Sequence, residues 1–581
     1  MFKSISTKII SLLAISAVAL VACSKDEEPA APSAAISASG DLLQYIPADS
    51  PYVFVSLEPI SDDIMDSLEP KLDRVLAAYR DVLNEVVAAK MGELDEEERN
   101  SDEAQRVQAV VQEFTTLLSV EGMRNAGIAR DSMFALYGNG LLPVMRVELS
   151  DEALFEAAIA RLEEEAGQTL PTGEVQGTEY RYFDADDLRI IVAVLKGQAV
   201  FSFVPSSFSE SQTGSALGLT LPAKSIADTD ILQGIIKKYD FTNHIVAFVD
   251  VPSLAERFVG EPTGLDADLI ALGSNRKQLS DVCKAEIREV AAIVPRMVMG
   301  YTGLTASRFE SNIVFELRKD LASGLTALAA PVPGLGGDSG GLMSFGMSLD
   351  IAAAREFMEA RLDAMEADPY ECEHLSDLQA GVATGRQSLS QPVPPIVYDF
   401  KGFNLVIDSI EGLDIKSQTP PTSIDGGFLL AMNNAQALVS MGAMFSPEIA
   451  GLNLQPDGKP VELALPQLQA MGMTAFAAMN DGGLAISLGE NAETRIGGML
   501  EADAATPPPF MSVSMDAARY YAFMGEAIAA GEAGGDDMPS PEMQAALTNM
   551  MDAIAELYDR MWIDVVFTEN GIEMHTVETL K

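Results

Sequence analysis

Two cysteines in the middle of the chain are candidates for covalent chemistry. The 581 residues include three cysteines, and Cys283 and Cys372 lie far from the third one near the N-terminus. In an oxidising compartment two such thiols pair readily, so we expect a disulfide between them. It would close a loop of about 90 residues and stabilise the fold by a few kcal/mol. The alternative is two separately buried thiols.

A serine between glycines is a candidate nucleophile. The motif at 337–341 (Gly-Asp-Ser-Gly-Gly) resembles the nucleophile motif of chymotrypsin-like serine proteases, whose glycines let backbone N–H groups form an oxyanion hole. That family also needs an upstream base in an Ala-His-Cys context, and the only upstream histidine is His244, which follows Asn. The residue after the motif is Leu342 instead of proline. We therefore expect no catalytic residue and keep a serine hydrolase at Ser339 as the least favoured alternative.

The metal-binding residue types are sparse and poorly spaced. The three histidines, His244, His374 and His575, show no ligand spacing. Cys372-Glu373-His374 would need distant partners to hold a metal, and the acidic run at 93–98 lacks the alternating pattern of a calcium loop. There is no glycine-rich phosphate-binding fingerprint. We expect neither a metal nor a cofactor.

The first 24 residues indicate export and lipid attachment. Lys3 and Lys8 precede an apolar run that is too short to span a bilayer. The run closes on Leu20-Val21-Ala22-Cys23, which resembles the lipobox of bacterial lipoproteins. The resemblance implies cleavage of residues 1–22 and acyl chains, such as palmitate, on Cys23, which anchor a protein stably. Ser24 instead of Asp implies, by similarity to enterobacterial sorting, the outer membrane on its periplasmic side.

The charge of the chain limits its partners. Lys and Arg number 38 against 86 Asp and Glu, and loss of the two lysines in residues 1–22 takes the balance to 36 − 86 = −50. Such a field repels phosphate backbones and anionic headgroups, which argues against nucleic acid. We expect membrane attachment through the acyl chains on Cys23 alone, with an envelope protein or a hydrophobic ligand as the partner.

A strand followed at once by a helix recurs along the chain. Each copy is an apolar strand that ends near Ser, Asp or Asn, whose side chain can cap the free N–H groups of the next helix. Other segments predict β-hairpins, the last with an Asn-Gly turn. The expected strands of the copies are 52–57, 144–149, 245–249, 342–349, 428–432 and 510–515, and the expected hairpins are 188–204, 474–488 and 561–577.

These patterns predict an α+β fold built from tandem duplicated halves. Each half is expected to be an antiparallel sheet with helices packed on one face, because the string 246–257 with 297–317 echoes 511–521 with 561–577. The expected parts are a signal peptide (1–22), the lipidated cysteine and a flexible tether (23–41), the first half (42–330) with a helical hairpin inserted near 63–118, a Pro/Gly linker (331–341) and the second half (342–581).

The abundance of methionine leaves the function open. Of the 28 methionines, 15 lie between Met432 and Met561. They could be adaptable core filler, line a deformable groove for a lipid or hydrophobic peptide, or bind copper. We favour a lipid-anchored, non-enzymatic binding or assembly module that faces the periplasm. The main alternative is a carrier of a lipid or other hydrophobic ligand in an apolar cavity.

Overall fold

The computed structural model describes residues 40–581 except 94, 96–98, 100, 186, 263, 273–278, 413–420, 465–471 and 530–539. The expected signal peptide, Cys23 and nearly all of the expected tether lie outside the described residues. Helix α3 (Gly40–Leu43) begins the described part, and Leu42 and Leu43 are fully buried. The two leucines are the first residues of the expected first half (42–330), and α3 begins two residues before that boundary.

The chain divides into two compact units whose limits differ from the expected halves. The first holds the described residues through 278, together with 296–311 and 534–557. The second holds 279–295, 312–533 and 558–581. The division does not fall at 331–341, because α13 (Asp281–Ala291) belongs to the second unit and α22 (Pro541–Leu557) to the first. Strand β10 (Arg308–Glu316) crosses the division.

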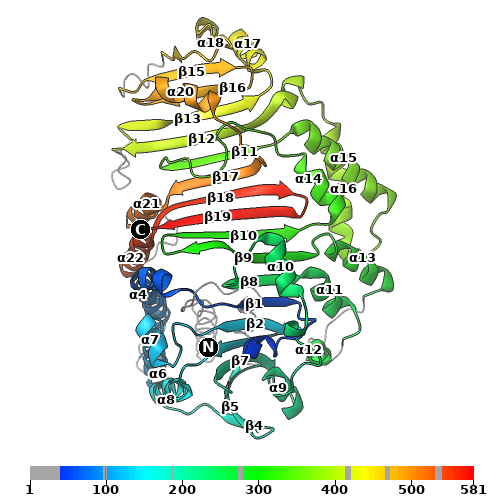
Figure 1. Cartoon of the computed structure of the whole chain (residues 1–581), viewed down its shortest axis with the longest axis vertical. Helices are drawn as coiled ribbons and strands as arrows, with labels where there is room; N and C mark the ends of the chain where they lie inside the picture. The colour runs from blue at the N-terminus through cyan, green and yellow to red at the C-terminus, as the bar shows by residue number, and fades with distance from the viewer. Residues whose placement is uncertain are drawn as a thin grey trace. The chain divides into compact units, whose positions relative to one another are not determined.

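The first unit is an antiparallel sheet with helices, in the strand order β4-β5-β6-β7-β3-β2-β1-β8-β9 (Figure 1). Its strands are β1 (Tyr52–Ser56), β2 (Phe134–Asn139), β3 (Leu142–Glu148), β4 (Thr172–Val175), β5 (Thr178–Ala185), β6 (Leu188–Leu195), β7 (Gln198–Pro205), β8 (Ile245–Asp250) and β9 (Arg296–Thr305). Its other helices are α4 (Asp62–Gly92), α6 (Asp102–Leu117), α7 (Val120–Asn125), α8 (Glu152–Ala166), α9 (Glu210–Ala216), η1 (Ile226–Asp228), α10 (Ile231–Tyr239), α11 (Val251–Val259) and α12 (Leu265–Leu272).

The second unit is also antiparallel, in the strand order β14-β15-β16-β13-β12-β11-β17-β18-β19. Its strands are β11 (Met343–Ser348), β12 (Phe400–Glu411), β13 (Ser423–Met432), β14 (Val461–Glu462), β15 (Ala475–Asn480), β16 (Gly483–Leu488), β17 (Pro509–Asp516), β18 (Tyr558–Thr568) and β19 (Gly571–Leu580). Its other helices are α14 (Lys319–Thr326), α15 (Ile351–Ala367), η2 (Glu373–Leu375), α16 (Ser376–Ser390), η3 (Pro395–Asp399), α17 (Ala435–Phe445), α18 (Pro447–Gly451), α20 (Ala492–Glu501) and α21 (Ala517–Ala529).

The strand-to-helix junctions follow the expected capping chemistry. The carboxylates of Asp151, Asp250 and Asp350 accept backbone N–H groups in the first turns of α8, α11 and α15. The Asn434 side chain does the same for α17. The three expected hairpins are β6–β7, β15–β16 and β18–β19. The expected helical hairpin near 63–118 is α4 and α6, which pack through Val87 and Val111.

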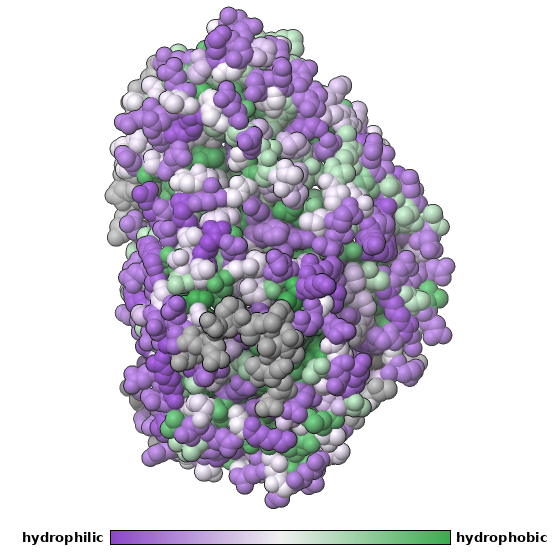
Figure 2. All heavy atoms as spheres, in the orientation of Figure 1, coloured by the Kyte–Doolittle hydropathy of each residue, from purple (hydrophilic) through white to green (hydrophobic). Residues whose placement is uncertain are grey.

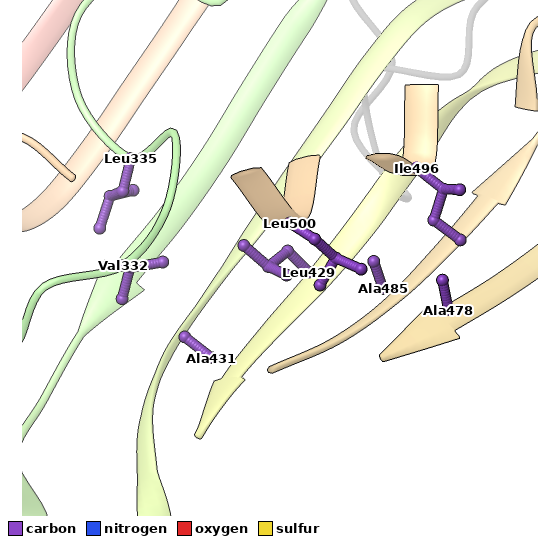
Figure 3. Packing of buried hydrophobic residues seen from close by; sticks show 8 residues of the cluster. All are labelled: Val332, Leu335, Leu429, Ala431, Ala478, Ala485, Ile496 and Leu500. Carbon is purple, nitrogen blue, oxygen red and sulfur yellow. The ribbon is translucent and has the colours of Figure 1, made fainter. Parts of the chain in front are cut away.

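Segment 331–341 is part of the core of the second unit and not a linker. Val332 and Leu335 are buried in one cluster with residues of β13, β15, β16 and α20 (Figure 3). Leu335 lies so close to β11 that position 346 must be glycine, because a Cβ at Gly346 would lie 2.5 Å from Leu335 Cδ1. The Pro/Gly composition predicted a linker, but the segment forms a loop that packs against the sheet.

Helices pack on both faces of the strands at one end of the second unit. The cluster beneath α20 contains Leu429 and Ala431, whereas the cluster beneath α17 contains Leu430 and Met432. Alternate residues of a strand point to opposite faces. The expectation of helices on one face only is therefore wrong at this end, because β13 is apolar on both faces.

Candidate functional site: an apolar sheet face

Two strands of the second unit bury small residues and leave large apolar ones open. In β11, Ser344, Gly346 and Ser348 are buried, whereas Met343, Phe345 and Met347 are not. Burial usually works the other way, because burying a large apolar side chain is favourable and burying a hydroxyl costs free energy unless it is hydrogen-bonded. The pattern thus marks the open side as a candidate binding surface.

Strand β17 repeats this inverted pattern next to β11. Ser512 and Ser514 are buried, whereas Met511, Val513 and Met515 are only partly covered. Directly paired residues of antiparallel strands share a face, and Met511, Val513 and Met515 pair with the three apolar residues of β11. The open residues of the two strands therefore form one continuous surface.

The same surface continues across β12 and β13 as a row of phenylalanines. Phe345 pairs with Leu405, which pairs with Phe428. The Phe403 ring centroid lies 5.6 Å from that of Phe345 and 6.0 Å from that of Phe428. Phe345 and Phe428 each keep 37% of their surface exposed. We call the open side chains of β11, β12, β13 and β17 the apolar face; they are Met343, Phe345, Met347, Phe403, Leu405, Phe428, Met511, Val513 and Met515.

The opposite side of these strands is already filled. Ser344 Oγ and Ser339 Oγ each lie 2.8 Å from Ser514 Oγ, so three hydroxyls satisfy one another between the strands and the 331–341 loop. The Asn404 amide donates to the Gly334 carbonyl oxygen at 2.8 Å. The Met and Phe side chains of the apolar face consequently have no room on that side.

Ser339, the candidate nucleophile, has a structural setting. Its Oγ is hydrogen-bonded to Ser514 Oγ and accepts the N–H of Gly341. Neither a hydroxyl nor an amide can take a proton as a general base does. His244 belongs to the first unit and Ser339 to the second. The glycines of the motif serve the loop, because Gly336, Gly337 and Gly340 have positive φ.

Asp338 in the same loop pins it to β18. The Arg560 guanidinium donates to both carboxylate oxygens of Asp338, at 2.6 and 2.5 Å, and to the Gly341 carbonyl at 2.8 Å. Burial alone would raise the pKa of Asp338, but the hydrogen bonds from Arg560 and the Gly340 N–H outweigh it and hold the pKa below its usual value. The acidic residue of the motif is therefore an ion-pair partner.

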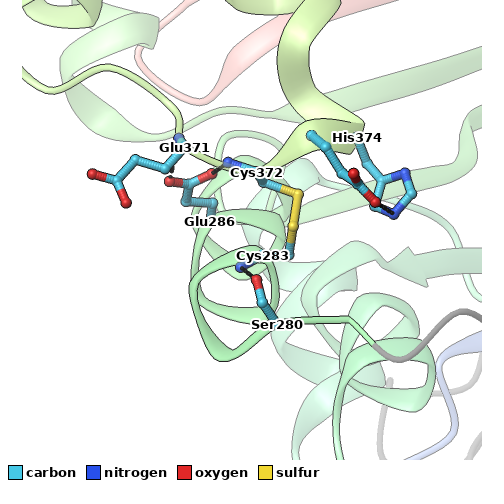
Figure 4. Close-up of a disulfide and its surroundings, with 7 residues drawn as sticks. Ser280, Cys283, Glu286, Glu371, Cys372 and His374 are labelled. Atoms are coloured by element: carbon cyan, nitrogen blue, oxygen red, sulfur yellow. Dashed lines mark hydrogen bonds and ion pairs between the residues drawn. A yellow bond between two sulfur atoms is a disulfide. The ribbon is translucent and has the colours of Figure 1, made fainter.

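Cys283 and Cys372 are joined by a disulfide in the second unit (Figure 4). Their Cα atoms are 4.6 Å apart across a sequence separation of 89. The Glu286 carboxylate on α13 accepts the backbone N–H groups of Glu371 and Cys372, so a second contact holds the same two segments together. Among the described residues, no group of three or more His, Cys, Asp or Glu side chains could hold a metal ion.

A polar cleft of about 670 Å³ lies in the first unit, between α8 and strands β5 and β6. Glu156 and Arg181 line it and form an ion pair at 2.7 Å, and Glu152, Glu179 and Lys196 complete its charged lining. Such a lining does not suit a lipid tail. The hydrophobic surface of interest is thus the open sheet face of the second unit.

The sequence reasoning missed this face, although a signal was present. Methionine and phenylalanine alternate with serine and glycine in 343–348, and methionine and valine alternate with serine in 511–515. Strict alternation predicts a two-sided strand, but it does not say which side is buried. The usual assumption that the large apolar side is buried would have hidden the surface.

On the side shown in Figure 2, hydrophilic residues predominate and hydrophobic ones form small separate groups. None of the described helices combines the length and apolarity that a bilayer-crossing segment requires. No protein-family model, no curated protein and no solved structure matches the chain.

Proposed function

We propose that this chain is a lipid-anchored, non-enzymatic binding module of the bacterial cell envelope. Its binding surface is the apolar face of the second unit, and its partner is an envelope protein with a hydrophobic segment. The observation that supports the proposal is the inverted burial of β11, in which Phe345 stays open while Ser344 and Ser348 are buried. A group of partly open apolar side chains on one face of a sheet marks an interaction site.

We also infer that the two units descend from a tandem duplication. Eight strands run in the same order in each, β5-β6-β7-β3-β2-β1-β8-β9 and β14-β15-β16-β13-β12-β11-β17-β18. Asp250 faces Arg296 across β8 and β9, and Asp516 faces Arg560 across β17 and β18. On this alignment α8 and α17 are counterparts, since they follow β3 and β13.

We propose that acyl chains on Cys23 anchor the protein in the outer membrane, with the folded body in the periplasm. Cys23→Ala is expected to give a folded protein that leaves the membrane fraction, or an uncleaved one held by its signal segment. The measurement is fractionation with immunoblotting and intact mass. A variant that is cleaved yet still sediments with membranes would contradict Cys23 as the stable anchor.

The binding surface is tested with Phe345→Glu combined with Phe428→Glu. Native mass spectrometry of the gently extracted wild type should show a bound protein, and the double variant should lose it because two buried charges would have to be desolvated. Leu188→Glu is the matched control, because Leu188 is an exposed apolar residue of a strand in the first unit. Retention of the partner by the double variant would refute this surface.

A lipid carrier is the second candidate, supported by the methionines of the apolar face. Met343, Met347, Met511 and Met515 flank the phenylalanines, and methionine adapts its shape to irregular ligands. In the same spectra a lipid would add a mass of several hundred daltons instead of that of a protein. That result would replace the protein partner by a lipid at the same face.

A further inference from the structure

Helix α17 carries no charged residue, and its outer side presents exposed apolar side chains at its C-terminal end. The inner side packs Ala435, Leu438 and Val439 into a cluster with residues of β13, β15 and β16. The outer side carries Met444 and Phe445, which are 75% and 84% exposed. Large apolar side chains are normally buried, and clustered exposed ones mark interaction sites. The outer side of α17 is therefore a surface that water solvates poorly.

Helix α18 extends the same surface. It follows α17 directly (Figure 1). Ile449 lies over Gly442 of α17, where an added Cβ would be 3.3 Å from Ile449 Cδ1. Met441 and Ile449 are exposed together with Met444 and Phe445. We call these four side chains, Met441, Met444, Phe445 and Ile449, the α17–α18 tip.

The charge of the tip selects the kind of partner. Residues 435–451 contain one charged residue, Glu448, in a chain of net charge −48. A basic or acidic protein segment would find almost nothing to pair with there, and the rest of the chain would repel an anionic surface. Electrically neutral lipid needs no ionic partner. Phenylalanine and methionine side chains enter the boundary between headgroups and acyl chains readily.

The short length of chain between Cys23 and the described residues keeps the protein near such lipid. Cys23 precedes Gly40, where the described chain begins, by 17 residues. A chain of that length spans at most about 60 Å when fully extended. A body held this close to a bilayer needs only a weak apolar contact, because tethering makes the contact intramolecular.

We propose that the α17–α18 tip inserts into the neutral lipid of the bilayer to which the chain is anchored. This second contact would hold the second unit at the membrane surface. The inference rests on the proposed anchoring through Cys23, which is why its test supplies the tether artificially.

The test uses the chain from Ser24 onward with a histidine tag in place of residues 1–23. The protein is bound to phosphatidylcholine vesicles that contain a small fraction of nickel-chelating lipid and, in one arm, brominated acyl chains. Phe445→Trp reports on the tip in a Trp562→Phe background, since Trp562 is the only tryptophan. The control is Leu154→Trp in the same background, because Leu154 is 42% exposed on α8, the proposed counterpart helix.

Tryptophan at 445 is expected to shift its emission to shorter wavelength and to lose most of its intensity to brominated lipid. Tryptophan at 154 should stay unchanged, and adding Met441→Ser and Met444→Ser should reduce the quenching at 445 severalfold. Equal behaviour of the two reporters, or none at 445, would overturn the proposal. An emission shift that grows with protein concentration without vesicles would also overturn it and assign the tip to a second copy of the chain. Because the tag replaces the native anchor, these failures are distinct from a failure of the Cys23 test.

Discussion

Helices α8 and α17 hold equivalent places in the two units and differ in one respect. Both bury an inner side against the sheet of their unit. Phe155 and Ile159 of α8 pack with residues of β6 and β7, and Leu438 and Val439 of α17 pack with residues of β13, β15 and β16. The sequence of α8 carries five glutamates and one arginine, whereas α17 carries no charge. The inner sides show what the fold requires. The outer sides are free to vary, so their difference points to a difference in use.

The sheets beneath these helices differ in the same direction. Phe134 and Met145 of the first unit are buried in a cluster with Phe54, Leu136 and other apolar side chains. In the second unit Phe345 and Phe428 remain open to solvent. One unit has thus closed its apolar face, whereas the other has kept it open. This difference favours a supporting role for the first unit and a binding role for the second.

The largest expected effect on stability concerns the buried inner sides of α8 and α17. Phe155→Ala should lower the free energy of unfolding by about 3 to 5 kcal/mol, because it empties a buried site. It also removes the edge-to-face contact with Phe201, whose ring centroid is 6.1 Å away. Leu438→Ala should lower the free energy of unfolding by about 2 kcal/mol, since Leu438 is only partly buried. Urea unfolding followed by circular dichroism measures both values.

Phe155→Leu is the control for the first helix and should retain most of the stability, because it keeps an apolar side chain in the site. A loss below about 1 kcal/mol for both alanine variants would contradict the comparison between α8 and α17. It would mean that the inner sides of the two helices do not anchor them.

The second expected effect concerns the disulfide, which lies within the second unit. Replacing Cys283 and Cys372 together by serine should lower the stability of the second unit by about 2 to 4 kcal/mol, because a loop of nearly ninety residues regains its freedom when unfolded. Trp562 lies in the second unit, so its fluorescence reports on that unit. The wild type in dithiothreitol should match the double variant, and an unchanged Trp562 transition would show that the crosslink does not support this unit.

Much of the architecture followed from local patterns in the sequence. Asp151, Asp250 and Asp350 were expected to cap helices after strands, and they do so because capping depends only on neighbours in the chain. The hairpins followed for the same reason, and Cys283 and Cys372, expected to pair, are bonded in the structure.

Long-range packing could not be read in the same way. Pro and Gly at 331–341 predicted a linker, yet Val332 and Leu335 enter the core, because Gly402 on β12 leaves room for Val332 and Gly346 on β11 leaves room for Leu335. The crossing of α13 and α22 between units likewise has no local signal. The apolar face was missed because alternation in 343–348 shows two sides of a strand without showing which is covered.

The third effect tests the loop that covers the small-residue side of the second unit. Arg560→Ala should destabilise it by about 1 to 2 kcal/mol, since the Asp338 carboxylate loses its bidentate partner at a partly exposed site. Because the pKa of Asp338 is lowered by folding, its contribution is complete above the unfolded value near 3.8 and is lost as the pH falls through the folded value.

The difference in stability between wild type and Arg560→Ala should accordingly be constant near neutral pH and shrink below about pH 4. Urea unfolding at several pH values, followed by Trp562 fluorescence, measures it. Arg560→Lys is the control and should recover part of the loss, because lysine keeps the charge but not the bidentate geometry. A difference that grows on acidification would have the wrong sign for this ion pair.

The smallest expected effect on stability makes the sharpest test of the comparison. Met444→Glu with Phe445→Glu gives α17 the acidic outer side of α8, and at exposed positions it should change the free energy of unfolding by no more than about 0.5 kcal/mol. The inner side, with Leu438 and Val439, is untouched, so the helix keeps its packing. Circular dichroism and urea unfolding check this. A loss above about 1 kcal/mol would mean that another part of the chain covers the outer side. In that case the outer side of α17 would be buried within the protein, and its difference from α8 would reflect packing instead of a binding function.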